Sequence, residues 1–184
     1  MIRLLYLLCS LLFLCIHAFP QQIYMTNSGT ASFVSDAPLE VIKAASIDLQ
    51  CAVNLDDKTF AFAIDNKSFK GFNSPLQQEH FYENYMQVQD YPTSTFKGKI
   101  IEMINPEDNA ELVVRAKGIL NIHGVEQERI IKGTLQKSGD EVILKADFTI
   151  PLEDHNIKIP KVVYQKIAEN INVSIEAQMS RNNP

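Results

Sequence analysis

Hydrophobic and polar residues alternate along most of the chain, and this pattern predicts β-strands. In residues 171–179 every odd-numbered residue is apolar and every even-numbered residue is polar. A strand with one buried face has this period of two because successive side chains point to opposite sides. Residues 47–54 and 142–150 alternate in the same way. Weaker alternation covers five further segments: 30–35, 59–65, 95–104, 112–122 and 129–136. The sequence therefore predicts eight strands.

Residues that favour tight turns separate most of these segments. They form four short clusters: 56–58, 105–109, 123–124 and 138–140. Such connections are short enough for hairpins between successive strands. Since helical segments do not alternate regularly with the strands, a parallel sheet is not expected. We therefore predict a mainly β fold, a single antiparallel up-and-down barrel of eight strands.

Two short helices are predicted between the strands. The first begins at Ser74, whose hydroxyl can cap it, with Pro75 in the first turn and Gln77 completing a capping box. It should end before Tyr91. The second helix begins at Pro160 and should pack one face on the barrel. Its apolar residues follow at spacings of four: Val163, Ile167 and Ile171.

The N-terminus has the features of a secretory signal peptide. Arg3 is followed by an apolar run, residues 4–16, and then by the small residue Ala18. The run is shorter than the roughly 20 residues that a membrane-spanning helix requires, and no second run follows, so no stable membrane insertion is expected. We predict that segment 1–18 is cleaved and that residues 19–184 form one domain. A periplasmic or secreted protein is the expected product.

The overall charge and the cysteines exclude several classes of protein. The chain has 17 Lys and Arg against 22 Asp and Glu, a formal charge of -5, and loss of Arg3 with the signal would make it -6. An acidic chain without a basic cluster disfavours a nucleic-acid partner. Cys9 and Cys15 lie in the predicted signal, and each follows a leucine rather than the small residue of a lipoprotein site. Cys51 is then alone, so no intrachain disulfide can form.

No catalytic motif is present. The chain lacks a nucleophile elbow and a glycine-rich phosphate loop, so we predict no enzymatic activity, no catalytic residue and no cofactor. Its histidines after the predicted signal, His80, His123 and His155, are more than 30 residues apart. They lack the spacing of a metal site, so structural or surface roles are favoured. A metal-dependent activity through His80 and His123 is an alternative hypothesis.

Large apolar side chains occupy the strand positions that would face the barrel interior. They include Phe33, Phe60, Phe62, Phe96 and Phe148. The interior of an eight-stranded barrel is just wide enough to be filled by side chains or to hold one small ligand. The residues alone are compatible with both a packed core and a ligand cavity.

Three segments carry motifs of a known family. Residues 71–98 have a His-Phe pair on the predicted helix, then a Tyr-Pro pair and a strand with Phe-x-Gly. Residues 118–125 form a strand that ends in a His-Gly-Val turn, and residues 148–160 contain two Ile-Pro pairs. These motifs, in this order, resemble the YceI-like family. The resemblance extends over roughly residues 29–179.

The resemblance implies a lipocalin-like barrel, exported in bacteria, whose relatives enclose a polyisoprenoid or an isoprenoid quinone in an apolar tunnel. Residues 29–38 lack the histidine motifs that the family usually has in its first strands, and His155 stands where many members carry an aromatic residue.

We accordingly expect an exported binding protein that holds an apolar isoprenoid-type lipid, with no nucleic-acid partner. The expected ligand-binding residues face the barrel interior or lie on the first helix: Leu49, Cys51, Phe60, Phe62, Phe81, Tyr85, Val114, Phe148 and Ile175. The alternative is a packed barrel that acts through its surface as a protein-interaction or stress-response module. The sequence leaves the oligomeric state open.

Overall fold

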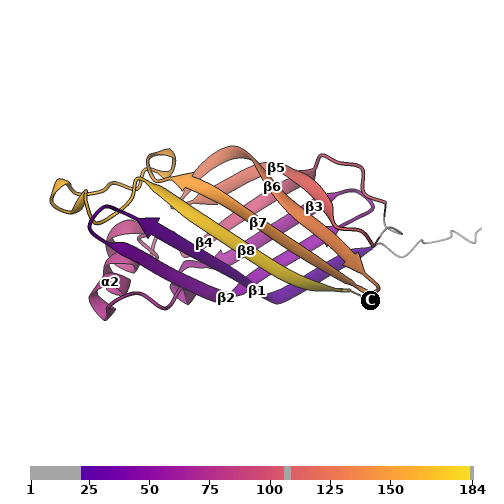
Figure 1. The fold of residues 1–184 in the computed structure, drawn as a ribbon, viewed down its shortest axis with the longest axis horizontal. Coiled ribbons are helices and arrows are strands. Elements are labelled where there is room, and N and C mark those ends of the chain that lie inside the picture. The colour runs from indigo at the N-terminus through magenta and orange to yellow at the C-terminus, as the bar shows by residue number, and fades with distance from the viewer. Residues whose placement is uncertain (1–21, 106–108, 183–184) are drawn as a thin grey trace, which may run out of the picture.

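Eight strands form a closed antiparallel barrel in the computed structural model, which describes residues 22–105 and 109–182 (Figure 1). The strands follow chain order around the barrel, and β8 closes it by pairing with β1. Their bounds are β1 Ile23–Asp36, β2 Val41–Asn54, β3 Thr59–Asp65, β4 Thr93–Ile100, β5 Leu112–Ile122, β6 Val125–Ser138, β7 Glu141–Pro151 and β8 Asn170–Arg181. The predicted eight-stranded barrel is confirmed. The predicted signal segment, 1–18, lies outside the described residues and stays a prediction.

The strand predicted over residues 95–104 is wrong at its end, because β4 stops at Ile100. Beyond it, the carboxylate of Glu102 accepts hydrogen bonds from the backbone N–H of Arg115 at 2.6 Å and from its Nε at 2.7 Å. A side chain thus takes the place of the backbone partner that a longer strand would have supplied.

The turn between β5 and β6 has the two-residue form that the sequence predicted. Ile122 pairs with Val125, and the two residues between them, His123 and Gly124, have φ angles of 53° and 73°. Positive φ at both positions is typical of the type I′ turn, whose twist matches that of the flanking strands. Glycine is required at the second position because a Cβ there would lie 2.4 Å from Cε1 of Tyr91.

The first predicted helix is present as α2, Pro75–His80, and continues as a π-helical turn, Phe81–Tyr85. The Ser74 hydroxyl accepts a hydrogen bond from the backbone N–H of Gln77, as predicted. The Gln77 side chain reaches back by one residue more than in a capping box and accepts from the N–H of Asn73 at 3.1 Å.

The second predicted helix is wrong. Only a 3₁₀ turn, Lys161–Val163, is found in this region. No side chain caps its start, and its β-branched valines favour a helix less than unbranched residues do. The carbonyl of Gln165 accepts a hydrogen bond from the N–H of Leu39 at 2.9 Å instead of continuing a helical ladder. Ile171 belongs to β8.

The barrel has a seam between β6 and β7, which pair with each other only from Gly133 onward along β6. Toward the α2 end, side chains bridge the separated strands. One guanidinium nitrogen of Arg129 donates to the carbonyl of Thr149 at 2.8 Å, and another lies 3.1 Å from the Asp154 carboxylate. The Gln127 amide donates to the Asp154 carbonyl at 2.7 Å. Side-chain hydrogen bonds therefore replace the backbone ladder along this stretch.

A 3₁₀ turn, Glu153–His155, packs beside this seam. His155 is completely buried, and its Nδ1 lies 3.2 Å from the carbonyl oxygen of Val125 on β6. Its own carbonyl accepts a hydrogen bond from Nδ1 of His123 at 3.0 Å. Burial lowers the pKa of His155, because desolvation disfavours the charged imidazolium. The neutral ring therefore suits this position.

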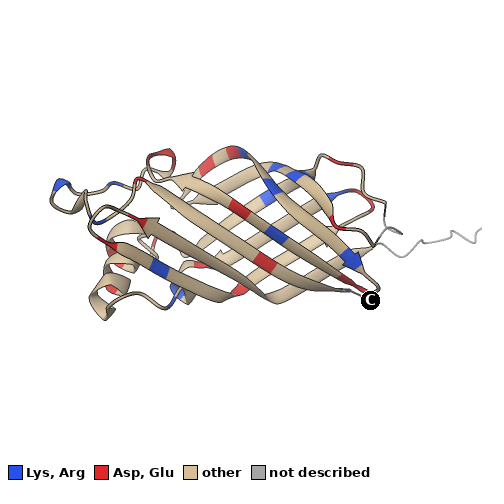
Figure 2. Cartoon of the chain, in the orientation of Figure 1, with Lys and Arg blue, Asp and Glu red and all other residues tan. Residues whose placement is uncertain are grey.

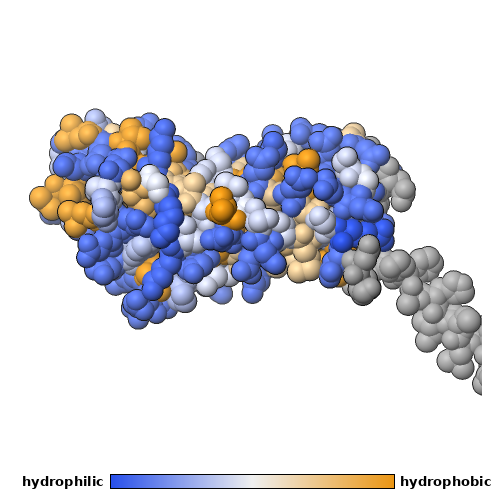
Figure 3. Space-filling view, turned by 90° about the horizontal axis from the view of Figure 1, so that it is seen from below, coloured by the Kyte–Doolittle hydropathy of each residue, from blue (hydrophilic) through white to orange (hydrophobic). Residues whose placement is uncertain are grey.

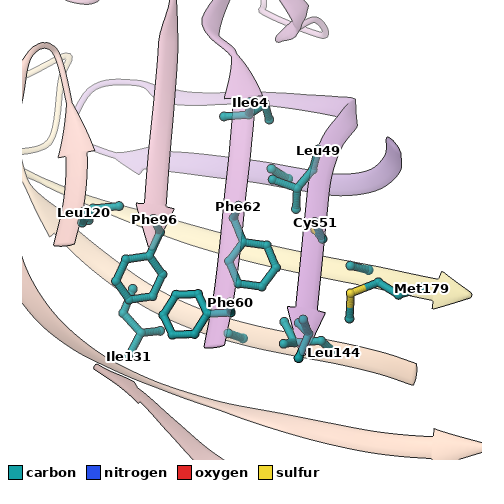
Figure 4. Packing of buried hydrophobic residues seen from close by; sticks show 14 of the residues in the cluster. Leu49, Cys51, Phe60, Phe62, Ile64, Phe96, Leu120, Ile131, Leu144 and Met179 are labelled. Carbon is teal, nitrogen blue, oxygen red and sulfur yellow. The ribbon is translucent and has the colours of Figure 1, made fainter. Parts of the chain in front are cut away.

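The interior is solidly filled at the end away from α2, which we call the closed end. The inward-facing residues Tyr24, Val53, Val142 and Met179 are completely buried there. Next to them the ring of Phe60 has its centroid 4.8 Å from that of Phe96. Figure 4 shows these rings beside Leu144, Cys51 and Met179, with side chains of opposite walls meeting. We call the opposite end, where α2 lies, the mouth end (Figure 1).

Candidate functional site

An apolar cavity of about 480 Å³ occupies the mouth half of the barrel. All eight strands contribute side chains to its wall. On β5 and β7 the lining residues nearest the closed end are Val114 and Leu144. The rings of Phe62 and Phe96 separate the cavity from the packed closed end. The volume lies within the range of roughly 300–1,000 Å³ that is typical of small-molecule sites.

Small residues keep this half of the interior open. Ala31, Ala116, Gly133 and Ala146 all line the cavity at inward positions of four different strands. Ala146 pairs directly with Gly133, so two small residues meet across one strand pair. A larger residue is excluded at Gly133, since a Cβ there would lie 2.5 Å from the carbonyl oxygen of Lys145. Small side-chain volume therefore contributes to the hollow.

Aromatic rings close one side of the mouth. The ring of Phe33 on β1 stacks on Phe81, with centroids 5.3 Å apart and an interplanar angle of 23°. Phe69 lies 5.4 Å from Phe33, and Phe72 lies 5.1 Å from Phe81. All four rings line the cavity, which places a flat, apolar surface against whatever occupies it.

The α2 segment that carries part of this cluster is held by polar contacts on its outer side. The hydroxyl of Tyr82 receives hydrogen bonds from the side chains of Gln78 at 2.6 Å and Lys70 at 2.9 Å. It also lies 2.8 Å from the carbonyl oxygen of Phe69. The Gln77 amide donates to the carboxylate of Glu40 at 2.7 Å. These contacts connect α2 and the turn after it to the segment between β3 and α2 and to the loop between β1 and β2.

The polar groups that line the cavity are few, and the buried ones, near the mouth ends of β1 and β3, are already bonded to protein. The buried Asn66 donates to the Tyr91 carbonyl at 2.8 Å and accepts from the Ser94 hydroxyl at 2.9 Å. The Ser35 hydroxyl accepts from the N–H of Ala168 at 2.9 Å. The wall therefore offers mainly apolar contact and little free hydrogen-bonding capacity.

Charged groups reach the cavity only at its rim. Among its lining residues in the described part of the chain, Lys166 is the single cation and Glu40 the single carboxylate. His80, on α2, also reaches the rim and is exposed. Partial burial raises the pKa of Tyr85, which keeps its phenol neutral. The arrangement suits a long apolar molecule with at most a small polar group at the mouth.

The structure places seven of the nine sequence-predicted residues in the cavity wall. These are Leu49, Phe62, Phe81, Tyr85, Val114, Phe148 and Ile175. Cys51 and Phe60 do not line it, although both are buried. Each lies one inward step closer to the closed end than a lining residue, Leu49 on β2 and Phe62 on β3.

Two lining residues that the sequence analysis missed are Phe69 and Phe72. They lie between β3 and α2, where no strand or helix periodicity marks inward positions. The available signal was composition, because large aromatic residues in a connecting segment are unusual unless they are buried.

Cys51 is a buried thiol in the packed half of the barrel. Desolvation raises the pKa of Cys51 to about 12, so its thiol stays protonated at neutral pH.

The two histidines of the alternative metal hypothesis have separate surroundings. The ring of His123 lies 3.0 Å from the His155 carbonyl and 2.7 Å from the Gln87 side chain. Within residues 22–105 and 109–182, no three His, Cys, Asp or Glu side chains gather to hold a metal ion.

No helix in the described part of the chain has the length and apolar character needed to cross a membrane. Acidic and basic residues are interspersed on the outer wall of the barrel (Figure 2). Several of them form ion pairs between neighbouring strands, as Lys145 does with Glu176 at 3.0 Å.

Residues 25–179 match the sequence model of the YceI-like domain. No curated protein sequence matches the chain. Among solved structures, the barrel is similar to a polyisoprenoid-binding domain from Saccharophagus degradans implicated in plant cell wall breakdown. The TM-score is 0.76 at 12% identity, with 89% of this chain and 100% of that chain covered.

Two further structures have the same fold. BcnA from Burkholderia cenocepacia aligns with a TM-score of 0.67 at 16% identity, over 83% of this chain and 96% of that chain. The YceI protein of Campylobacter jejuni aligns with a TM-score of 0.56 at 14% identity, over 93% and 92%. Identities this low support the shared fold alone.

Proposed function

The chain belongs to the YceI-like family, and on this premise we propose that it binds an apolar isoprenoid-type lipid, a polyisoprenoid or an isoprenoid quinone, in its barrel. The proposal assigns the protein a binding role without a catalytic step. It also assigns the protein to the periplasm or the exterior of the cell, because residues 1–18 have the order of a secretory signal.

The observation that carries the proposal is the cavity itself. A closed barrel of this size can be filled by its own side chains, yet this one is filled in one half and hollow in the other. The hollow half is lined by aliphatic and aromatic side chains, with charged groups only at the rim. An apolar chain is the ligand class that such a wall would favour.

The ligand class is further supported by a relative. The Saccharophagus degradans domain is a polyisoprenoid-binding domain, and it has the same barrel. A polyisoprenoid is a linear chain of isoprene units, each with one methyl branch, so it offers the wall apolar surface and few polar atoms. The shape of the cavity would then select chain length, while the rim would contact a head group.

Burial of apolar surface would drive binding. Each methylene group removed from water contributes about 0.8 kcal/mol, so affinity should rise with chain length. The rise should stop when the chain fills the roughly 480 Å³ available. A plateau in a series of polyprenols of increasing length would therefore measure the usable cavity.

The alternative of a packed surface-acting module predicts a barrel too full for a chain-like ligand. The open volume weighs against that alternative. The packed-module alternative does not explain why Ala31, Ala116 and Ala146 are small, whereas the ligand hypothesis explains them as space for the lipid.

Native mass spectrometry of protein purified gently from its own host tests the proposal, followed by solvent extraction and identification of any bound molecule. A stoichiometric isoprenoid is the expected result. An Ala116→Phe variant, whose ring would occupy part of the cavity, should retain less of it. Ala61→Phe is the matched control, since Ala61 is exposed on the outside of β3.

The result that would overturn the proposal is an empty, stable wild-type protein that also refuses added polyprenols and quinones. Equal lipid content in Ala116→Phe and wild type would also count against the cavity as the binding site.

Sequencing the N-terminus of the protein recovered from culture fractions tests the proposed export, because a cleaved protein should begin close to Phe19.

A further inference from the structure

We infer that the mouth end docks on an anionic lipid bilayer through the loop formed by residues 156–167, which we call the basic loop. This inference rests on the proposed function, because it concerns how an apolar ligand would reach the cavity. An apolar lipid has little solubility in water, so a carrier must collect it from a membrane or from another carrier.

The basic loop differs in charge from the rest of the chain. It contains Lys158, Lys161 and Lys166 and no acidic residue, whereas the whole chain has a formal charge of -5. All three lysines are exposed, and none of them takes part in the ion pairs found among the described residues. Figure 1 shows the loop projecting beyond the barrel at the mouth end, and Figure 2 shows basic residues at its tip.

Exposed apolar side chains lie next to these lysines. Val162 is 88% exposed and Tyr164 is 65% exposed. On the neighbouring loop Leu39 is also exposed, and its N–H donates to the Gln165 carbonyl at 2.9 Å, which holds the two loops together. Figure 3 shows hydrophobic side chains gathered at this end of the molecule. Lysine and tyrosine beside aliphatic residues are typical of segments that lie in the membrane interface.

The exposed apolar surface is continuous with the cavity. Val162 points outward from the 3₁₀ turn, while its neighbour Val163 lines the cavity, as does Ile167. Leu76, on α2, is both exposed and part of the lining. A lipid leaving the acyl layer beneath a docked loop could therefore pass along apolar side chains without crossing water.

Charge complementarity favours an anionic bilayer as the partner. Basic residues next to an anionic membrane each strengthen binding by roughly fivefold. Acidic residues near the mouth lie outside the basic loop. They are Glu79 on α2, Glu83 after it, Glu153, Asp154 and Glu169 on the two flanks of the loop, and Glu40 on the neighbouring loop. The basic loop, and not the whole rim, should therefore contact the head groups, with the barrel axis tilted.

Vesicle flotation with the purified protein tests this inference. The probes are vesicles of phosphatidylcholine alone and of phosphatidylcholine with phosphatidylglycerol. The wild type should float with the second kind and be partly released by salt. Lys158→Gln combined with Lys161→Gln, and Val162→Ser combined with Tyr164→Ser, should each weaken binding by roughly tenfold or more. None of these four residues lines the cavity.

Met103→Ser is the matched control, because Met103 is 83% exposed and lies beyond β4 at the closed end. It should float like the wild type. Polyprenol dispersed in detergent micelles provides the second measurement, in which all variants should bind with wild-type affinity. Transfer of a fluorescent polyprenol from anionic vesicles should be slower in both double variants.

The docking inference is overturned if the wild type ignores anionic vesicles, or if the double variants float as well as the wild type. Binding of micellar polyprenol by a protein that does not float would remove the docking inference and leave the proposed function standing. Flotation without binding of micellar polyprenol would remove the proposed function and leave docking standing.

Discussion

The two halves of the barrel share the same strands but differ in what fills them. At the closed end Tyr24, Val53, Val142 and Met179 meet across the interior and are completely buried. At the mouth end the same inward phase of the strands includes Ala116 and other small residues, and a cavity of about 480 Å³ remains. The comparison teaches that alternation decides which side chains point inward, whereas their summed volume decides whether the interior is solid.

The two halves also differ in how they are held together. The closed end is held by packing of apolar side chains, and β6 and β7 pair through their backbones there. At the mouth end the seam between β6 and β7 is bridged by side chains such as Arg129. Stability should therefore depend on packing at the closed end and partly on polar groups at the mouth end.

The largest difference in the free energy of unfolding between the two halves is expected when a leucine in each half is replaced by alanine. Leu135→Ala, at the closed end, should lower the free energy of unfolding by about 3–5 kcal/mol, because a new cavity forms in a packed region. Leu120→Ala should cost about 2 kcal/mol in the ligand-free protein, since Leu120 already borders an empty volume. Denaturant unfolding measures both. Equal losses would show that the mouth half is as tightly packed as the closed half.

Matched additions of side-chain volume should also destabilise the closed end more than the mouth end. Ala177→Phe should lower the free energy of unfolding by about 1–3 kcal/mol or more, because Ala177 is completely buried at the closed end. Ala116→Phe should leave it nearly unchanged, because the ring enters the cavity. Thermal unfolding of the two ligand-free variants provides the comparison. A strongly destabilised Ala116→Phe would indicate that the cavity is narrower at β5 than the lining residues suggest.

The sequence predicts the barrel well and the cavity only in part. Alternation over residues 59–65 and 112–122 gave the bounds of β3 and β5 because each strand has one buried face. The same alternation could not separate Cys51 from Leu49. Both face inward, and only the position of the packed region along the barrel distinguishes them.

The wrong prediction of a helix after Pro160 also arises because local sequence does not report tertiary contacts. The spacing of four residues after Pro160 predicted a helix, yet Val163 and Ile167 line the cavity from a 3₁₀ turn and the loop after it. Tertiary contacts determine this segment, among them the hydrogen bond between Leu39 and Gln165. Such contacts join residues far apart in the chain, so local periodicity carries no information about them.

The smallest expected effect is a loss of stability at low pH, which should act at the mouth end and not at the closed end. Burial lowers the pKa of His155 below its ordinary value of 6.5, so the folded protein favours the neutral ring. The unfolded chain then binds a proton more readily than the folded one, and stability falls as pH drops below about 6.5. The slope from this one group cannot exceed about 1.4 kcal/mol per pH unit.

Hydrogen exchange at pH 7.5 and at pH 5 should locate this loss, both values being chosen as roughly one unit or more on either side of the ordinary histidine pKa. Amides of β6 near Val125, which faces Nδ1 of His155, should lose protection at the lower pH. Amides near Val53 at the closed end should keep theirs, because packing there does not depend on a titrating group. His155→Gln, which can still donate to the Val125 carbonyl, should reduce the difference, whereas His80→Gln at the exposed rim should leave it intact. Uniform loss of protection at both ends would mean that the barrel opens as one unit, and the division into a packed half and a polar-bridged half would then have no consequence for stability.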